Sequence, residues 1–297
     1  MSSAILPSQP PKATSSKAPY WYHVGGSVIG KYHIDHSIPC QDAHHVDTLE
    51  GCWQIAVVSD GAGSYENSHH GSQYIVANMA STIIKYLKKY KWFSKGSLPT
   101  RKNWRNISIR TIKDLRKQLQ VYAKEEGFPF SSLGATVIVM IFSPKGCLTF
   151  HVGDGRCAVL TKSGEWIPTS VPFMGDEAGS TVFLTTSWLL EHQEDCIKTS
   201  VIRKPVKAIV ALSDGMEKFS FQCFVPDEDN PGSWKDSNTP FAPFLNHNIN
   251  VISASYKDGR SRIEVDEVFS NFLLNGHPKI AMEPDDKTLI FSILKSN

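Results

Sequence analysis

The sequence predicts an α+β protein folded as a four-layer α-β-β-α sandwich, in which two antiparallel sheets are flanked by helices. Short apolar runs with strand character recur along the chain, separated in several places by turns too short to hold a crossover helix, which favours antiparallel pairing. Long amphipathic helical patterns do not alternate with every strand, which argues against a parallel sheet. The helices are therefore expected on the outer faces of two packed sheets.

Composition indicates a folded globular chain: of 297 residues, 41% are apolar and 20% are charged. Residues 1–19, rich in Pro, Ser and Lys, are expected to form a disordered tail, and residues 20–297 a single domain. A net charge of +2 provides no field that would attract nucleic acid or an anionic membrane. The longest apolar run, residues 135–142, is far shorter than the roughly 18 residues of a membrane helix.

Six cysteines are scattered along the chain without a Cys-x-x-Cys pair, and no apolar signal segment opens it. This pattern predicts free thiols and a cytoplasmic location. We also expect a monomer that binds neither nucleic acid nor a membrane.

The first buried strand is expected at residues 52–59 (CWQIAVVS), because an uninterrupted apolar run is typical of a strand covered on both faces. Residues 71–90 and 107–126 carry apolar side chains at helical spacing and predict two amphipathic helices. A basic connector that contains tryptophans, residues 91–104, joins them.

Strand patterns then follow in quick succession, at residues 135–142, 147–152, 156–161 and 181–186. Residues 207–213 repeat the pattern of the first buried strand, and residues 287–294 form the last strand. Weaker helical patterns around residues 241–245 and 265–274 flank a polar loop at 226–240. Residues 163–181 are expected to form a flap, in which Asp176 and Glu177 are not assigned as ligands.

An aspartate stands at the end of an apolar strand three times, at Asp60, Asp154 and Asp214, and Asp285-Asp286 precedes the last strand. A single Asp-Gly after a strand is most often only a turn. Strand ends of a sandwich gather in space, however, and two carboxylates about 5 Å apart repel by about 3 kcal/mol at an effective dielectric near 20. Such a cluster must hold protons or cations, and its oxygen ligands favour Mg²⁺ or Mn²⁺ over Zn²⁺.

Six short motifs, taken in order, resemble those of the metal-dependent type 2C (PPM) protein phosphatases, most closely the bacterial-type branch. They are PCQDA (residues 39–43), VVSDGAGS (57–64), LGATVIVMIF (133–142), VGDGRCAVL (152–160), ALSDGM (211–216) and DDKT (285–288). The resemblance implies two Mn²⁺ or Mg²⁺ ions, with a weaker third, and hydrolysis of phosphoserine and phosphothreonine by a metal-bridged water. It also implies phosphorylated protein substrates and, as partners, a cognate Ser/Thr kinase or its targets.

Carried over residue by residue, the resemblance places Asp60 at the bridging ligand and Gly61 where a backbone carbonyl binds one ion. Asp214 and Asp285 match the ligands of the other ion, and Asp154 matches the position of the weaker third ion. Asp42 matches an acidic residue that holds metal-bound water. Asp286 stands where the family usually has Asn, so we expect it near the ions rather than bound to them.

Two positions depart from the family pattern. His33 is the best match for an arginine that holds the substrate phosphate, and it lacks the charge and bidentate fork of arginine. Ala62 stands where eukaryotic members carry a histidine that can act as general acid. One hypothesis is that His69 or His70 takes that role, although a solvated loop histidine is the more common situation.

Several alternatives remain open at this point. A non-catalytic relative acting as a regulatory scaffold would keep the fold, and a hydrolase of small phosphate esters would keep the chemistry. Five residues between His33 and His45 look like a zinc cluster, but their spacing fits no standard zinc motif. Residues 85–105 mix cations and aromatics as a nucleic-acid groove does, yet the balanced charge favours aromatics that pack internally.

Overall fold

The computed structural model describes residues 21–92, 97–173 and 181–295. One five-stranded sheet consists of β2 (Ala43–Glu50), β3 (Trp53–Ser59), β4 (Val137–Ser143), β5 (Gly146–Val152) and β8 (Lys198–Ile202), in that order. The other consists, in spatial order, of β1 (Trp21–Val28), β14 (Lys287–Leu294), β9 (Val206–Leu212), β6 (Arg156–Thr161) and β7 (Trp166–Pro168). All neighbouring strands are antiparallel.

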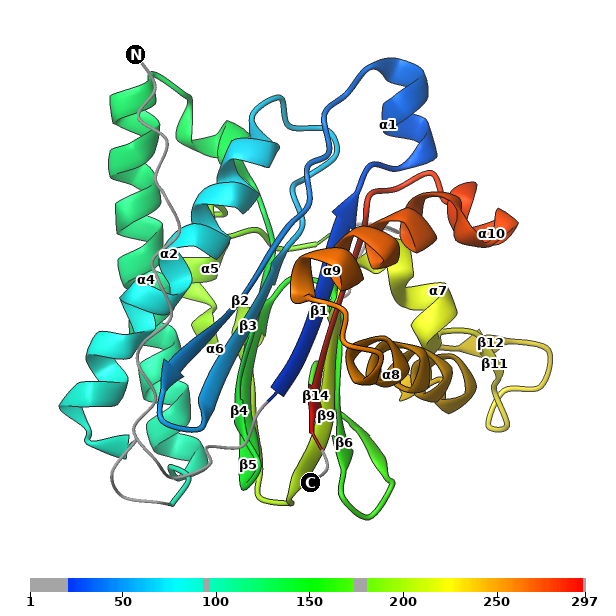
Figure 1. Cartoon of the computed structure of the whole chain (residues 1–297). Helices are drawn as coiled ribbons and strands as arrows, with labels where there is room; N and C mark the ends of the chain where they lie inside the picture. The colour runs from blue at the N-terminus through cyan, green and yellow to red at the C-terminus, as the bar shows by residue number, and fades with distance from the viewer. Residues whose placement is uncertain (1–20, 93–96, 174–180, 296–297) are drawn as a thin grey trace.

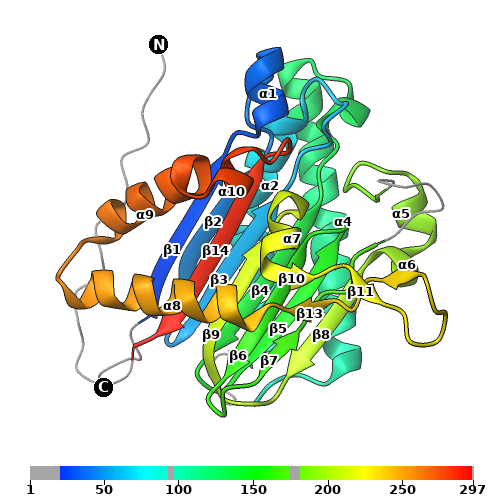
Figure 2. The same cartoon turned by 90° about the vertical axis from the view of Figure 1, so that its right-hand side faces the viewer.

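Two pairs of helices cover the outer faces of these sheets (Figure 1). The first sheet carries α2 (Ser68–Lys89) and α4 (Arg101–Glu126), and the second carries α8 (Ala242–Lys257) and α9 (Arg262–Asn271), which lie in front of it in Figure 2. The predicted α+β class and four-layer sandwich are therefore confirmed. None of the described helices is long and apolar enough to cross a membrane.

Short elements complete the chain. The helical ones are α1 (Lys31–His36), η1 (Phe130–Leu133), α5 (Trp188–Glu191), α6 (Gln193–Cys196), η2 (Asp214–Met216), α7 (Glu217–Ser220), η3 (Phe272–Gly276) and α10 (Pro278–Ala281). Within the expected loop at 226–240 and just before it, two-residue strands pair as β10 (Phe221–Gln222) with β13 (Thr239–Pro240) and as β11 (Val225–Pro226) with β12 (Trp234–Lys235).

Three apolar layers explain why the central strands read as uninterrupted apolar runs. Along β4, Val139 and Ile141 face α2 and α4, whereas the alternate residues Met140 and Phe142 face the second sheet. A third layer fills the space between the second sheet and the helices α8 and α9. Each central strand therefore buries both of its faces, and at about 25 cal/mol per Å² this burial is the main force that holds the layers together.

The turn between β5 and β6 differs from the sequence prediction. Residues 144–146 join β4 and β5 as an antiparallel hairpin, as expected, but β5 and β6 do not pair with each other. The chain passes from one sheet to the other at residues 153–155. Gly153 makes this possible because its φ of +108° is a conformation that side chains rarely allow.

The prediction of a strand at residues 181–186 is wrong. Val182 and Leu184 are buried, which produced the apolar pattern, but among the described residues the segment forms only one backbone hydrogen bond to a strand-forming segment, from Leu184 N–H to Ala135 O. A turn at residues 183–186 then ends the extended stretch. Without a continuous ladder, the segment is a packed loop.

The connector at residues 91–104 is shorter than predicted, because α4 begins at Arg101. The Thr100 hydroxyl accepts a hydrogen bond from Asn103 N–H and so caps the helix. The indole of Trp104, fully buried in the first turns, donates to Thr149 O of β5. Polar residues on the exposed face of these turns hid the helical pattern.

Some predicted features lie outside the described residues. The tail at residues 1–19 is one of them, and so are Asp176 and Glu177 of the predicted flap. The described part of residues 163–181 begins as a hairpin, since β7 pairs with β6. It then runs to Val171 and Phe173, which are tied by hydrogen bonds to His151 and Gly153.

Candidate active site

In the first sheet, one aspartate directly precedes a strand and another directly follows its neighbour, next to the same pair of residues. Ala43 of β2 pairs with Ser59 of β3, so Asp42 and Asp60 lie next to each other where this pairing ends. Backbone bonds with Thr136 fix Asp60: its N–H donates to the threonine hydroxyl and its carbonyl accepts from the threonine N–H. The strand pairing therefore delivers both carboxyl groups to one place.

The second sheet brings three more aspartates to the same end of the sandwich. Leu212 of β9 pairs with residues near the ends of both β14 and β6, so Asp214, Asp285 and Asp154 all lie just beyond the paired parts of neighbouring strands. Figure 1 shows this end at the top, near α1 and the chain that enters β14. The convergence predicted from the motifs is present.

Ser213 joins the two groups of aspartates. Its hydroxyl donates to Asp42 Oδ2 at 2.6 Å and accepts from the Thr288 N–H at 3.0 Å. Its own N–H donates to Thr288 O. One buried serine thus links the residue before Asp214 to the start of β14 and to Asp42.

Glycines are required after two of the aspartates because other backbone lies against them. A Cβ at Gly61 would stand 2.7 Å from Gln41 O, and one at Gly215 would stand 2.1 Å from Asp286 O. Gly61 also donates its N–H to Gln41 O. The loop that carries Asp42 is therefore packed against the residue after Asp60, and the start of β14 against the residue after Asp214.

The carboxyl groups of this cluster strongly disfavour a common negative charge. Burial, followed by the charge of the other aspartates, raises the pKa of Asp60 and of Asp214 well above the usual value. Burial likewise raises the pKa of Asp42 to about 7. Asp154 and Asp285 shift in the same direction, again chiefly through burial. No Lys or Arg forms an ion pair with any of the five in the described part of the chain.

The donor set fits hard divalent cations that retain part of their water. One oxygen each of Asp42, Asp154 and Asp214 is buried without a hydrogen-bond partner, as expected for atoms that await a ligand. No three His, Cys, Asp or Glu side chains among the described residues form a closed ligand set for one ion. Mg²⁺ keeps several waters and is usually held by only one or two carboxylates, so a closed cage is not needed.

His33 and Asp286 form a buried pair at the side of this cluster. Asp286 Oδ1 lies 2.9 Å from His33 Nδ1 and also accepts from Gly30 N–H, while Oδ2 accepts from Gln41 N–H. Asp286 is thus engaged by protein groups on both oxygens, consistent with a place near the ions rather than among their ligands. His33 and Asp285 line the same cavity, of about 350 Å³, together with Tyr32, Gly63, Ser64 and Pro284.

The other histidines of this region have separate surroundings. The rings of His69 and His70 lie against each other, His70 stacks on Phe128, and neither lines the cavity that contains Asp285. His44 pairs with the Ser27 hydroxyl, and His36 with Tyr32 O. The residues that look like a zinc cluster in the sequence therefore make individual contacts.

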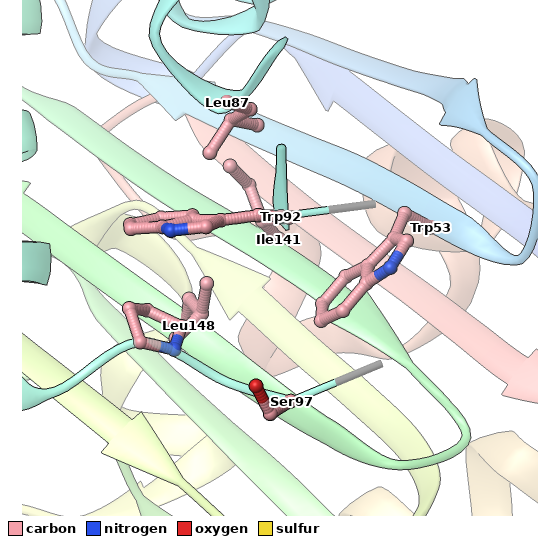
Figure 3. Close-up of a pocket in the computed structure, with 7 residues that line it drawn as sticks. Trp53, Leu87, Trp92, Ser97, Ile141 and Leu148 are labelled. Atoms are coloured by element: carbon pink, nitrogen blue, oxygen red, sulfur yellow. The ribbon is translucent and has the colours of Figure 1, made fainter. Parts of the chain in front are cut away.

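The two tryptophans of the basic connector pack inside the protein. Trp92 and Trp104 are buried in the layer between α2, α4 and the first sheet. Trp92 lines an apolar cavity together with Trp53, Leu87 and Leu148 (Figure 3). The cavity lies at the end of the strands opposite to the aspartates. Its volume of about 10 Å³ leaves room for about one water molecule. These rings are unavailable for stacking on bases.

Sequence reasoning missed two sets of residues that position the site. Ser59 and Ser213 each precede an Asp-Gly, and their hydroxyls bind Thr136 O and Asp42; the repeated Ser-Asp-Gly was the signal that could have found them. Arg156, two residues after Asp154, is the second. Its buried guanidinium donates hydrogen bonds to Glu217, Asp236 and Asn238. These partners are 61 to 82 residues away in the sequence, and no local motif predicts the contact.

Fold and site together define a class of protein: an α-β-β-α sandwich that gathers acidic oxygens at one end for divalent cations. The family model of protein phosphatase 2C matches residues 29–257. The chain belongs to the protein phosphatase 2C family, and so is a metal-dependent serine/threonine protein phosphatase that acts on phosphorylated proteins.

Known proteins similar to this chain agree with that assignment. Serine/threonine-protein phosphatase 3 of Escherichia coli K12 is 23% identical over 281 residues, covering 92% of this chain and 98% of the relative. The fold is similar to that of Stp1 from Staphylococcus aureus (TM-score 0.51, 14% identity, 96% and 100% of the two chains covered). It is also similar to the catalytic domain of the phosphatase PstP, solved with two manganese ions (TM-score 0.51, 14% identity, 93% and 99% covered).

Proposed function

We propose that the five aspartates at this end of the sandwich are the active site, and that they hold two Mn²⁺ or Mg²⁺ ions with a weaker third. Asp60 and the Gly61 carbonyl would hold one ion, Asp60 with Asp214 and Asp285 the other, and Asp154 the third. The observation that carries the proposal is the convergence of carboxyl groups whose burial and mutual charge raise their pKa, with no Lys or Arg ion pair to any of them among the described residues. Only cations or protons can stabilise that arrangement.

When bound, the ions supply an activated water and offset negative charge on the phosphoryl oxygens. The residues of the chain orient the attacking water and bind the substrate. Asp42, held by Ser213 at 2.6 Å, orients the attacking water. The cavity beside Asp285 receives the phosphorylated side chain, with His33 in its wall. Most of the acceleration then comes from positioning and electrostatic stabilisation.

Replacing Asp214 by Asn tests the assignment. We expect the variant to fold and to lose turnover of a phosphoserine peptide with Mn²⁺ by several orders of magnitude. Asp47→Asn is the matched control, because Asp47 lies on β2, five residues beyond Asp42, with a side chain 60% exposed. An Asp214→Asn protein with wild-type activity contradicts the proposal.

Further features of the proposal concern the chain as a whole. Residues 20–297 form one phosphatase domain, acting as a monomer on a cognate Ser/Thr kinase or on its targets. All six cysteines are free thiols, which supports a cytoplasmic location. Size-exclusion chromatography coupled to light scattering tests the monomer, and a phosphopeptide panel narrows the substrate.

A further inference from the structure

The His33–Asp286 pair is built rigidly into the wall of the active-site cavity. Asp286 is 2% exposed and His33 4%. The carboxylate is held by two backbone donors, Gly30 N–H at 2.7 Å and Gln41 N–H at 2.5 Å. Its Oδ1 lies 2.9 Å from Nδ1 of the imidazole, a close contact that is not aligned as a hydrogen bond in this structure. The ring therefore turns Nδ1 toward Asp286 and Nε2 away from it.

The short helix that carries His33 is also fixed. The N–H groups of Lys31 and Tyr32 donate to the carbonyls of Glu283 and Pro284, immediately before Asp285. These two hydrogen bonds tie the helix to the segment that leads into β14. The imidazole consequently keeps its place relative to Asp285, which lines the same cavity.

The second ring nitrogen of His33 is available to a substrate. Neither a hydrogen bond nor an ion pair from His33 Nε2 occurs among the residues that the structure describes, and of the two ring nitrogens only Nδ1 is buried without a hydrogen-bond partner. Since His33 lines the cavity with Asp285, Nε2 is the ring atom that can meet a bound phosphoryl group or its leaving oxygen.

The reaction requires a proton donor near the oxygen that leaves phosphorus. Breaking the bond from phosphorus to a serine oxygen leaves an alkoxide, a poor leaving group unless it is protonated as it departs. The other cavity residues offer no comparable donor: Tyr32 stacks its ring on His36, outside the buried wall, and Ser64 carries a weakly acidic hydroxyl. Histidine is the side chain that exchanges protons near neutral pH.

We propose that His33 is the general acid of the reaction, donating its Nε2 proton to the departing serine or threonine oxygen, with Asp286 as its positioning residue. This inference rests on the proposed function. Water forms a new bond to phosphorus, and the bond from phosphorus to the serine oxygen breaks with its electron pair on that oxygen. The oxygen takes the proton from Nε2. One hydrogen of the attacking water stays on the phosphate, and the other returns to His33 through solvent.

The experiment compares two substrates that differ in their need for a proton. A phosphoserine peptide releases an alkoxide, whereas para-nitrophenyl phosphate releases a stable phenolate. His33→Asn keeps an amide that can face Asp286 and removes the Nε2 position. With Mn²⁺ and under single-turnover conditions, we expect the rate on the peptide to fall by about 10² to 10⁴ and the rate on para-nitrophenyl phosphate to change little.

Two further variants separate this role from simple phosphate anchoring. Arginine holds phosphate well but does not release its proton in proteins, so His33→Arg should remain defective on the peptide. Asp286→Asn should give a smaller loss with the same substrate selectivity. His36→Asn, on the exposed face of the same helix, is the matched control, and melting temperatures establish that each variant folds.

Several results would overturn the inference. Equal losses on both substrates, or rescue of the peptide rate by His33→Arg, would show an anchoring role. An unchanged peptide rate in His33→Asn would remove His33 from the reaction, and a selective peptide loss in a His69→Ala, His70→Ala double variant would transfer the role to α2. Failure of the proposed function is distinguishable, because Asp214→Asn would then remain active on both substrates.

Discussion

Asp42→Asn replaces a buried acid with a neutral amide of nearly the same shape inside a cluster of repelling carboxyl groups. In the metal-free protein, burial first and then the charges of Asp286 and Asp285 raise the pKa of Asp42 from 3.8 to about 7. At 1.36 kcal/mol per pKa unit, the shift corresponds to about 4 kcal/mol of lost stability when the group is forced to ionise. The amide has no proton to lose, so this cost disappears in the variant.

The sign of the effect depends on pH. Below pH 3.8 the carboxyl is protonated in both the folded and the unfolded chain, and the substitution should change stability little. Between pH 3.8 and about 7, the unfolded chain releases a proton that the folded chain retains, so the wild-type free energy of unfolding falls as pH rises. Above pH 7 the full difference of about 4 kcal/mol favours the variant.

Urea unfolding with a chelator, at several pH values between 4 and 8, measures this difference. For a chain of 297 residues, with an unfolding entropy of about 2.1 cal/mol/K per residue, about 4 kcal/mol corresponds to a rise in melting temperature of roughly 6 °C. The amide can still accept the hydrogen bond of Ser213, so the native contacts are preserved. Asp47→Asn, an exposed change on β2, the strand that follows Asp42, should show no comparable dependence. A variant no more stable than wild type at pH 8 without metal would refute the reasoning.

The remaining predictions concern metal, a buried ion pair and acid stability. Chelation should abolish turnover of para-nitrophenyl phosphate, and Mn²⁺ or Mg²⁺ at 100 times its dissociation constant should restore it and add about 2.7 kcal/mol of stability, seen as a shift in the thermal unfolding curve. Arg156→Met should cost about 3 to 5 kcal/mol in urea unfolding, because it leaves Glu217 and Asp236 without their buried partner; a loss below 1 kcal/mol would contradict that view. Burial lowers the pKa of His151 to about 4, so stability should fall as pH drops from 6.5 to 4, by up to about 3 kcal/mol for this group. His151→Gln should flatten that decline.

The fold was predictable where a strand buries both faces. β3 and β9 are continuous apolar runs that end at an Asp-Gly, and their positions follow directly from the sequence. The strands β1 and β2 escaped prediction for physical reasons: β1 contains two glycines, and β2 is an edge strand whose last residues are exposed. The buried loop at residues 181–186 shows the converse error, since apolar alternation reports burial but not a ladder of hydrogen bonds.

Within the site, local motifs predicted the convergence of the aspartates but not how their neighbours are arranged. Each Asp-Gly marks the end of a strand, and packing two sheets brings such ends together. The contact between His33 and Asp286 joins the two ends of the chain, and nothing near either residue in the sequence announces it. Whether a buried histidine faces a carboxylate depends on the register of β14 against β1, which a single sequence does not display.

The strand pairing that brings the aspartates together also explains how the fold accommodates several carboxyl groups close to one another. Strand pairing continues to the residue before Asp60 and to within two residues of Asp214, so the backbone is held on both sides of the point where charge accumulates. Burial and the neighbouring carboxyl groups therefore raise the pKa of Asp60 and Asp214, and one oxygen each of Asp42, Asp154 and Asp214 is left without a hydrogen-bond partner. Under the proposed function, a divalent cation bound there would offset the repulsion between the carboxylates, and its affinity would gain from that relief. Substitutions that relieve the repulsion should accordingly stabilise the metal-free fold and weaken catalysis together.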